Sequence, residues 1–385
     1  MGNSHWTKPE NLITFGNMKI KTISFVNHNT GWEIRNMSLS YLTLFVGASG
    51  VGKTKILRAI YCLSRIAAGD SYNGIEWNVT FECHEREYRW SGEFVGIKEE
   101  GLSYFERNEQ SYPIKKEKLS DMSTDFVVRT NDEIIFNGKP TVKLDTSKSI
   151  ISLLKEEDDI KPVFDAFRQI YFLKNDNRSI RVSPVINKKR EQIKDAESLH
   201  DNRILTPIEK LFVLRKNELN LFESIKQDFI SIFPLVEDID FTAERFFDGT
   251  SCPVLRIKER GVSSWIYQDE ISSGMIRTLS QITMLALAQD GDVILIDEFE
   301  NGLGVNCIDR LTDQIKDVDQ EVQVIMTSHH PYIINHIPVG WWKVVTRSHS
   351  MVSAYTAEQL HIGEYSKHEA FMQLIQTDAF TKGQK

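Results

Sequence analysis

The chain has 385 residues and a mass of 44.4 kDa, enough for one large α/β core with an insertion or for a few domain-sized units. Hydrophobic residues make up 41% and charged residues 26%, so the composition excludes a collagen-like or wholly disordered chain. The 46 basic and 54 acidic residues give a net charge of −8, which argues against a uniformly basic surface for nucleic acid but leaves room for a local basic groove.

The N-terminal third opens with two predicted strands, because residues 18–26 alternate polar and apolar side chains and residues 41–46 form a more buried apolar run. Glycines follow the second strand at once. Residues 53–68 then carry apolar side chains at helical spacing, which predicts an amphipathic helix. From 72 to 140 the pattern is that of strands, with a hairpin expected around Asp125–Gly138.

The middle of the chain, residues 147–232, is mostly helical in its pattern. A polar, basic stretch, Asn175–Arg190, interrupts it. We interpret this stretch as a solvated loop, with a phosphate-binding surface as the less favoured alternative. No heptad pattern is sustained here, so we expect no long coiled-coil arm.

The C-terminal third alternates strands with helices, the order that predicts a parallel sheet. Strands are expected over residues 252–258, 292–297, 321–327 and 342–346. Helices are expected over residues 274–289 and 305–316, with a short helix after Pro331 and a loosely docked one after Tyr365.

Residues 47–54, Gly-Ala-Ser-Gly-Val-Gly-Lys-Thr, fit the pattern G-x-x-x-x-G-K-[ST] and lie between a predicted strand and a predicted helix, as this motif requires. Glycines allow consecutive backbone N–H groups to turn toward phosphates, and the helix N-terminus adds partial positive charge. Lys53 is expected to reach the β- and γ-phosphates of ATP, and the Thr54 hydroxyl to bind Mg²⁺. The residues expected to surround the phosphates are Gly47, Ser49, Gly50, Val51 and Gly52.

Residues 292–297 form an apolar strand that ends in carboxylates, at the edge where parallel α/β sheets bind their ligands. Asp297 is expected to hold Mg²⁺ directly or through water, and Glu298 to orient and polarise the attacking water. Alone, such a strand end is common and usually meets a solvated loop. Together with the phosphate loop it indicates a nucleotide-hydrolysing enzyme.

A third motif, Ser272-Ser273-Gly274, opens a predicted helix about twenty residues before this strand. With it the chain resembles the ATP-binding-cassette (ABC) class of ATPases, in the branch that contains SMC, RecF and the OLD-type ATPases. The signature of that family binds the γ-phosphate of ATP held by the opposite protomer, with a hydroxyl, backbone N–H groups and the helix dipole. The resemblance assigns this role to Ser272 and Gly274.

The same resemblance covers two further segments. Residues 324–332 look like the family's switch segment, which assigns His329 to sensing the γ-phosphate, although a histidine after a strand is more often a surface or core residue. Residues 297–303 look like the D-loop that contacts the other protomer, but Gly304-Val305 stands where many relatives have His-Pro. For the family's Q-loop glutamine, the candidate is Gln169.

The resemblance implies an α/β fold: an ABC-ATPase head with a P-loop NTPase core, a β-rich N-terminal lobe and a helical insertion. We expect an N-terminal ATPase lobe (18–145), a mainly helical insertion (146–265), a C-terminal ATPase lobe (266–360) and a tail (361–385). Because the signature would act in trans, we expect a homodimer or higher homo-oligomer that closes around ATP.

A compact head of this branch resembles the ATPase subunit of two-gene anti-phage defence systems such as PARIS or Septu. The resemblance implies a toxin–antitoxin-like sensor and scaffold that controls a separate Toprim-like or HNH nuclease or toxin and responds to a phage-encoded trigger protein. The alternative is a RecF- or SMC-like DNA-repair ATPase that binds DNA directly. The segment after His330 shows no D-x-D pattern, so we expect ATPase activity but no nuclease activity of the chain's own.

Localisation signals are quiet. The longest apolar runs, residues 42–46 and 293–296, have the length of strands, far short of the ~20 residues of a bilayer span. The first residues show neither a signal peptide nor a myristoylation motif, and the four cysteines lie far apart. We therefore expect a cytoplasmic protein with reduced thiols and no membrane contact.

Overall fold

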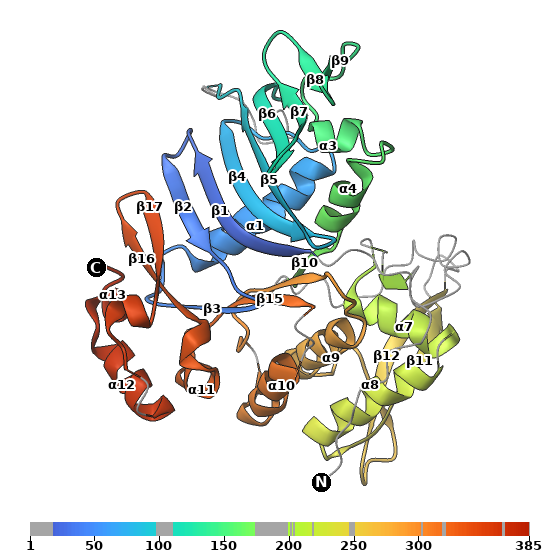
Figure 1. Ribbon diagram of the computed structural model, residues 1–385. Helices are drawn as coiled ribbons and strands as arrows, with labels where there is room; N and C mark the ends of the chain where they lie inside the picture. Colours follow the sequence, from blue (N-terminus) through green and yellow to red (C-terminus); the bar gives the residue numbers. More distant parts are fainter. Residues whose placement is uncertain are drawn as a thin grey trace.

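The computed structural model describes residues 18–97, 111–173, 199–200, 202, 205–217, 219–245, 251–301, 303–317, 321–363 and 366–384. Within these residues, 14 strands form one mixed sheet and a further three form a small separate sheet (Figure 1). Helices cover the large sheet, so the predicted α/β fold class is confirmed.

The centre of the large sheet is parallel, as the alternation of strands and helices predicts. Its strands, in spatial order, are β10 (Ile170–Leu173), β14 (Val293–Ile296), β15 (Gln323–Thr327), β3 (Leu42–Val46) and β16 (Trp342–Ser348). Every residue of β3, β14 and β15 is buried. This burial explains their unbroken apolar runs, because both faces of a parallel sheet are covered.

The centre is joined to an antiparallel lobe by one strand, β17 (Met351–Thr356). It pairs antiparallel with β16 and parallel with β2 (Trp32–Ser38). The lobe continues, antiparallel throughout, in the order β1 (Lys19–Asn27), β4 (Ile75–Cys83), β5 (Arg86–Phe94), β6 (Ile114–Asp121), β7 (Asp125–Arg129), β8 (Ile134–Phe136) and β9 (Lys139–Pro140). The hairpin expected around residues 125–138 is confirmed as β7 and β8.

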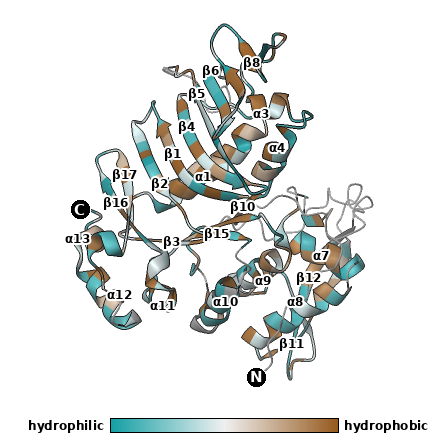
Figure 2. Ribbon diagram, in the orientation of Figure 1, coloured by the Kyte–Doolittle hydropathy of each residue, from teal (hydrophilic) through white to brown (hydrophobic). Residues whose placement is uncertain are grey.

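The antiparallel lobe packs over α1 (Lys53–Ala67), the helix that follows the phosphate loop (Figure 1). Every second residue of β4 is buried, and Figure 2 shows the lobe's strands with alternating hydrophobic and hydrophilic bands. Trp77 and Trp90 meet edge to face with ring centroids 5.2 Å apart, and Phe167 of α4 (Lys161–Arg168) packs on Trp90. The short helix α3 (Ile150–Leu153) closes this core.

A second core lies on the other face of the parallel strands, since Leu44 belongs to it while the next residue, Phe45, belongs to the first. Its helices are α7 (Pro207–Asn217), α8 (Leu219–Ile232), α9 (Ser273–Ala286), α10 (Val305–Asp317), α11 (Pro331–His336), α12 (Lys367–Gln376) and α13 (Asp378–Thr381). The small sheet beside them consists of β11 (Val236–Arg245), β12 (Ser251–Glu259) and β13 (Trp265–Tyr267), and two 3₁₀ turns are η3 (Val339–Trp341) and η4 (Glu358–Leu360).

Several strands are missing from the sequence prediction, namely β2, β10, β11, β13 and β17. β10 lies within the segment expected to be a mainly helical insertion, yet it pairs with β14 in the central sheet. A short apolar run of this length cannot be told from a helical segment by periodicity.

The basic stretch 175–190 lies outside the described residues. No helix in the described part of the chain is both long and apolar enough to cross a bilayer.

Candidate nucleotide-binding site

The phosphate loop, residues 47–52, connects β3 to α1 at the carboxyl end of the parallel strands. Gly47, Gly50 and Gly52 have φ angles of 141°, 82° and 111°, a region that only glycine adopts readily. A Cβ on Gly47 would lie 2.7 Å from the Val345 carbonyl oxygen, whereas one on Gly50 would meet no atom within 4 Å. The loop is therefore tightly packed at its first glycine and open at Gly50.

The Lys53 ammonium lies inside this loop. Its Nζ donates hydrogen bonds to the carbonyl oxygens of Gly47 at 2.7 Å and Ala48 at 2.9 Å. Burial lowers the pKa of Lys53, and the nearby carboxylates of Glu300, Asp297 and Glu298 partly oppose that shift. One cation and three carboxylates thus share this end of the sheet.

Asp297 joins three segments that are far apart in the sequence. Its Oδ1 accepts a hydrogen bond from the Thr54 hydroxyl at 3.0 Å and another from the Thr327 hydroxyl at 2.8 Å. The Thr327 hydroxyl in turn accepts a hydrogen bond from the Glu298 N–H at 2.7 Å. The structure therefore brings together the two residues predicted to bind Mg²⁺, and adds Thr327, whose role the sequence did not indicate.

Thr54 and Asp297 could hold a magnesium ion. Their oxygens are 3.0 Å apart, and adjacent ligands at about 2.1 Å from an octahedral Mg²⁺ ion are separated by about 3.0 Å. The described residues contain no group of three or more His, Cys, Asp or Glu arranged for a metal. The remaining ligands would then be water and phosphate oxygens, which magnesium commonly keeps.

Glu298 follows Asp297 at the edge of the sheet and is exposed. Its φ of 47° is uncommon for a residue with a side chain, and such strain is often found at functional sites. Its carboxylate Oε2 accepts a hydrogen bond from the Asn301 side chain at 2.9 Å. The Glu298 N–H bond to Thr327 holds the backbone in this conformation, and the residue is exposed at the carboxyl end of β14.

His329 is bound by a carboxylate that the sequence analysis missed. Glu300 Oε1 accepts the His329 N–H at 2.8 Å and lies 2.8 Å from His329 Nδ1. The Glu300 side chain is 6% exposed and the His329 side chain 57%. Because Nδ1 faces Glu300, Nε2 is the ring nitrogen that remains for a further partner. The sequence feature that could have indicated this contact is a second acidic residue two positions after Glu298.

Ser272 and Gly274 lie at the start of α9, as expected. The Ser272 hydroxyl caps this helix by accepting a hydrogen bond from the Met275 N–H at 3.2 Å, and Ser272 is exposed. The Gly274 carbonyl accepts from Thr278 within the helix at 2.9 Å. In the described residues, the Ser272 side chain bonds only to its own helix, not to the phosphate loop of the same chain.

Gln169 is wrong as the candidate for the Q-loop. It precedes β10, and its carbonyl accepts from the Val293 N–H at the amino end of β14. Asp297 follows the opposite, carboxyl end of β14. Because the two strands are parallel and in register, Gln169 lies at the far edge of the sheet from the phosphate loop.

Comparison with protein families agrees with this geometry. Residues 42–335 match the family described as "AAA domain, putative AbiEii toxin, Type IV TA system". The chain belongs to this family. It is thus a P-loop ATPase domain, and the family is linked by its description to toxin systems. No curated protein sequence matches the chain.

Solved structures similar to the chain include three SMC head domains. An SMC head bound to the C-terminal winged-helix domain of ScpA is 15% identical, with a TM-score of 0.48, covering 87% of this chain and 96% of that one. A head with an extended coiled coil bound to the C-terminal domain of ScpA, from Pyrococcus furiosus, is 14% identical with a TM-score of 0.49, covering 89% and 98%. The head domain from Thermotoga maritima is 13% identical with a TM-score of 0.42, covering 88% and 98%.

Glu300→Gln tests the contact with His329. The amide keeps the size of the side chain but removes the negative charge that favours an Nδ1–H donor. Loss of one charge-assisted hydrogen bond, about 1.5 kcal/mol, should lower the ATPase turnover number about tenfold and leave ATP binding close to normal. The exposed Glu133→Gln is the matched control. Turnover equal to that of the control would show that Glu300 does not act through His329.

Proposed function

We propose that the chain is an ABC-type enzyme that binds ATP and hydrolyses it to ADP and phosphate. The observation that supports this proposal best is the single Asp297 oxygen that accepts hydrogen bonds from both Thr54 and Thr327. This oxygen brings together the start of α1, the end of β14 and the end of β15. The point where they meet lies beside the open side of the phosphate loop.

Each side chain has a distinct task in this proposal. The loop residues Gly47, Ser49, Gly50, Val51 and Gly52 would surround the phosphates, and Lys53 would exchange its bonds to the loop carbonyls for bonds to phosphate oxygens. Thr54 and Asp297 would hold Mg²⁺, which neutralises phosphate charge when bound. Glu298 would orient the attacking water, and His329, held by Glu300, would bind the γ-phosphate through Nε2.

We further propose that ATP binding closes copies of the chain around the nucleotide, as a homodimer or as a higher homo-oligomer. Ser272 is exposed at the N-terminus of α9, where a helix can bind an anion, but its hydroxyl bonds to its own helix in this chain. The signature residues Ser272 and Gly274 would therefore meet the γ-phosphate held by the partner copy. Neither copy alone would have a complete hydrolytic site.

The biological role that we propose is that of a sensor and scaffold in anti-phage defence, of the PARIS or Septu kind. The chain would control a separate toxin or nuclease and respond to a phage-encoded trigger. The family's association with toxin systems supports this role. We propose that the chain carries out this role in the cytoplasm.

Ion pairs on the antiparallel lobe count against direct DNA binding at that face. Lys21 pairs with Glu82 at 2.9 Å and Glu87 at 2.8 Å, and Lys116 pairs with Glu93 at 3.0 Å. At these positions each lysine is paired with carboxylates of nearby strands, which makes it less available to a phosphate backbone. A RecF- or SMC-like repair ATPase would need uncompensated cations for the phosphate backbone.

Lys53→Ala should severely weaken ATP binding. The substitution removes the cation and its bonds to phosphate, a loss of about 3 kcal/mol or about a hundredfold in affinity. Isothermal titration with ATP and Mg²⁺ measures the effect, and Lys55→Ala, an exposed lysine on the same helix turn, is the control. Normal affinity of the Lys53 variant would contradict the phosphate-loop assignment.

Ser272→Arg should prevent closure of the dimer while sparing ATP binding by the monomer. Glu298→Gln should bind ATP, hydrolyse it slowly and accumulate closed dimers in native mass spectrometry. Adding Ser272→Arg to Glu298→Gln should return the protein to monomers, because the arginine would fill the site of the partner's γ-phosphate. Ser123→Arg, in the exposed β6–β7 turn, is the control. Undiminished dimers in the double variant would reject a signature that acts in trans.

The partner is tested by expressing the chain with its neighbouring genes. We expect a neighbour-encoded toxin or nuclease to co-purify with the chain, and we expect the ATPase rate to be indifferent to plain duplex DNA. DNA-stimulated hydrolysis, together with DNA binding that falls steeply with salt, would favour the repair alternative instead.

A further inference from the structure

The phosphate loop rests on the C-terminal part of the chain. A Cβ on Gly47 would meet the Val345 carbonyl of β16 at 2.7 Å, and one on Gly52 would meet the Val352 side chain of β17 at 3.1 Å. Gly50, by contrast, faces open space. The loop is therefore backed on one side by C-terminal strands and free on the side where Gly50 lies.

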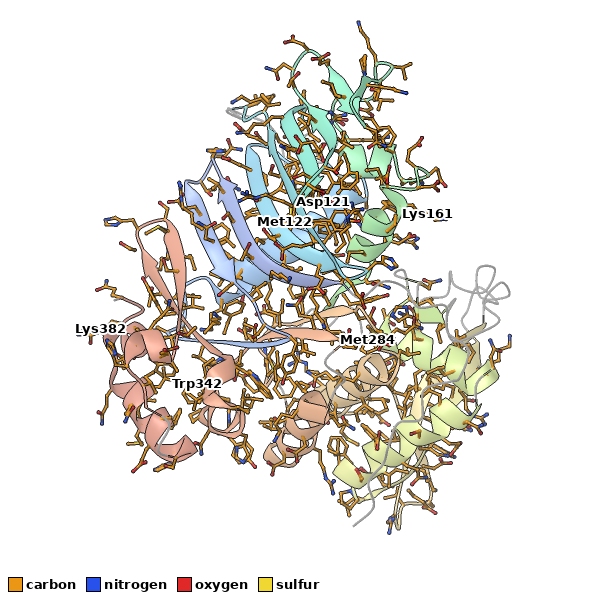
Figure 3. All side chains as sticks on the ribbon, viewed as in Figure 1. Asp121, Met122, Lys161, Met284, Trp342 and Lys382 are labelled. Carbon is orange, nitrogen blue, oxygen red and sulfur yellow. The ribbon has the colours of Figure 1, made fainter. Side chains whose placement is uncertain are left out.

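A third contact comes from Gly383, just after α13. A Cβ at this glycine would lie 2.3 Å from Val51 Cγ1 and 3.7 Å from Ala48 Cβ. Val51 is 5% exposed, so its side chain is covered although it belongs to a surface loop. In Figure 1 the C-terminus lies beside α13, β16 and β17, and Figure 3 labels Lys382, the residue before Gly383, at the same place.

The segment that carries Gly383 is held by bonds of its own. The Gly383 carbonyl accepts a hydrogen bond from the Arg347 N–H at the end of β16, at 2.7 Å. Thr377 caps α13 by accepting from the Phe380 N–H at 3.2 Å, and Ala379 is buried in the second core. The segment is thus anchored by contacts other than the one with Val51.

We propose that Gly383 is a positioning residue for ATP binding. Through its contact with Val51 it holds the loop backbone in the conformation whose N–H groups meet the phosphates. Val51 is β-branched and stiff, so a side chain at position 383 would displace the loop itself and not only a rotamer. This inference rests on the proposed binding of ATP at that loop.

The test is a double-mutant cycle between Gly383→Ala and Val51→Ala, read out as the affinity for a fluorescent ATP analogue with Mg²⁺. We expect Gly383→Ala to weaken binding about tenfold in the natural background. In the Val51→Ala background, where the γ-methyl groups are gone, the same substitution should change the affinity little. An equal penalty in both backgrounds, or none in either, would overturn the proposal.

Gly138→Ala separates the contact from backbone strain. Gly383 and Gly138 have similar φ angles, 68° and 74°, but a Cβ on Gly138 meets no atom within 4 Å. Melting temperatures without nucleotide should fall in both variants, and further in Gly383→Ala because the clash with Val51 adds to the backbone strain, while only Gly383→Ala loses ATP affinity. Failure of the unsubstituted chain to bind ATP would refute the proposed function. If the unsubstituted chain binds ATP and Gly383→Ala leaves the affinity unchanged, only this inference is refuted.

Discussion

One carboxylate oxygen organises the site. Asp297 Oδ1 accepts hydrogen bonds from the hydroxyls of Thr54 and Thr327, so the ends of two neighbouring strands and the first turn of α1 meet at one atom. A backbone hydrogen bond also joins the ends of β14 and β15, since the Phe299 N–H donates to the Thr327 carbonyl at 3.0 Å. Groups supplied by residues more than two hundred positions apart in the sequence are thereby fixed before any ligand arrives, which is the preorganisation that phosphate chemistry requires.

One side chain links the two lobes by forming the pair of hydrogen bonds that a neighbouring strand would form. Gln323, at the start of β15, accepts the Ile20 N–H through Oε1 and donates to the Ile20 carbonyl through Nε2, both at 2.9 Å. Its amide thus pairs with β1 as a backbone peptide would. Because Gln323 is buried, this link joins the antiparallel lobe to the parallel centre in a region from which water is excluded.

Much of the site could be predicted because its motifs are local. The glycine spacing fixes the loop, and Lys53, Thr54 and Asp297 each stand at the start of a helix or the end of a strand that periodicity reveals. The Glu300 contact with His329 could not be predicted, because it depends on the left-handed turn at Glu298 that sends the chain back toward β15. The placement of β10, β2 and β17 likewise depends on pairing between distant segments, which no local pattern reports.

The outermost strand of the large sheet also bears on how copies of the chain associate. β9 consists of two exposed residues, Lys139 and Pro140, at the end of the described sheet. Proline lacks the N–H that an added strand would bind, and lysine resists burial against a neighbour. Pairing of a further strand, from this or another copy, is therefore disfavoured at this border of the described sheet.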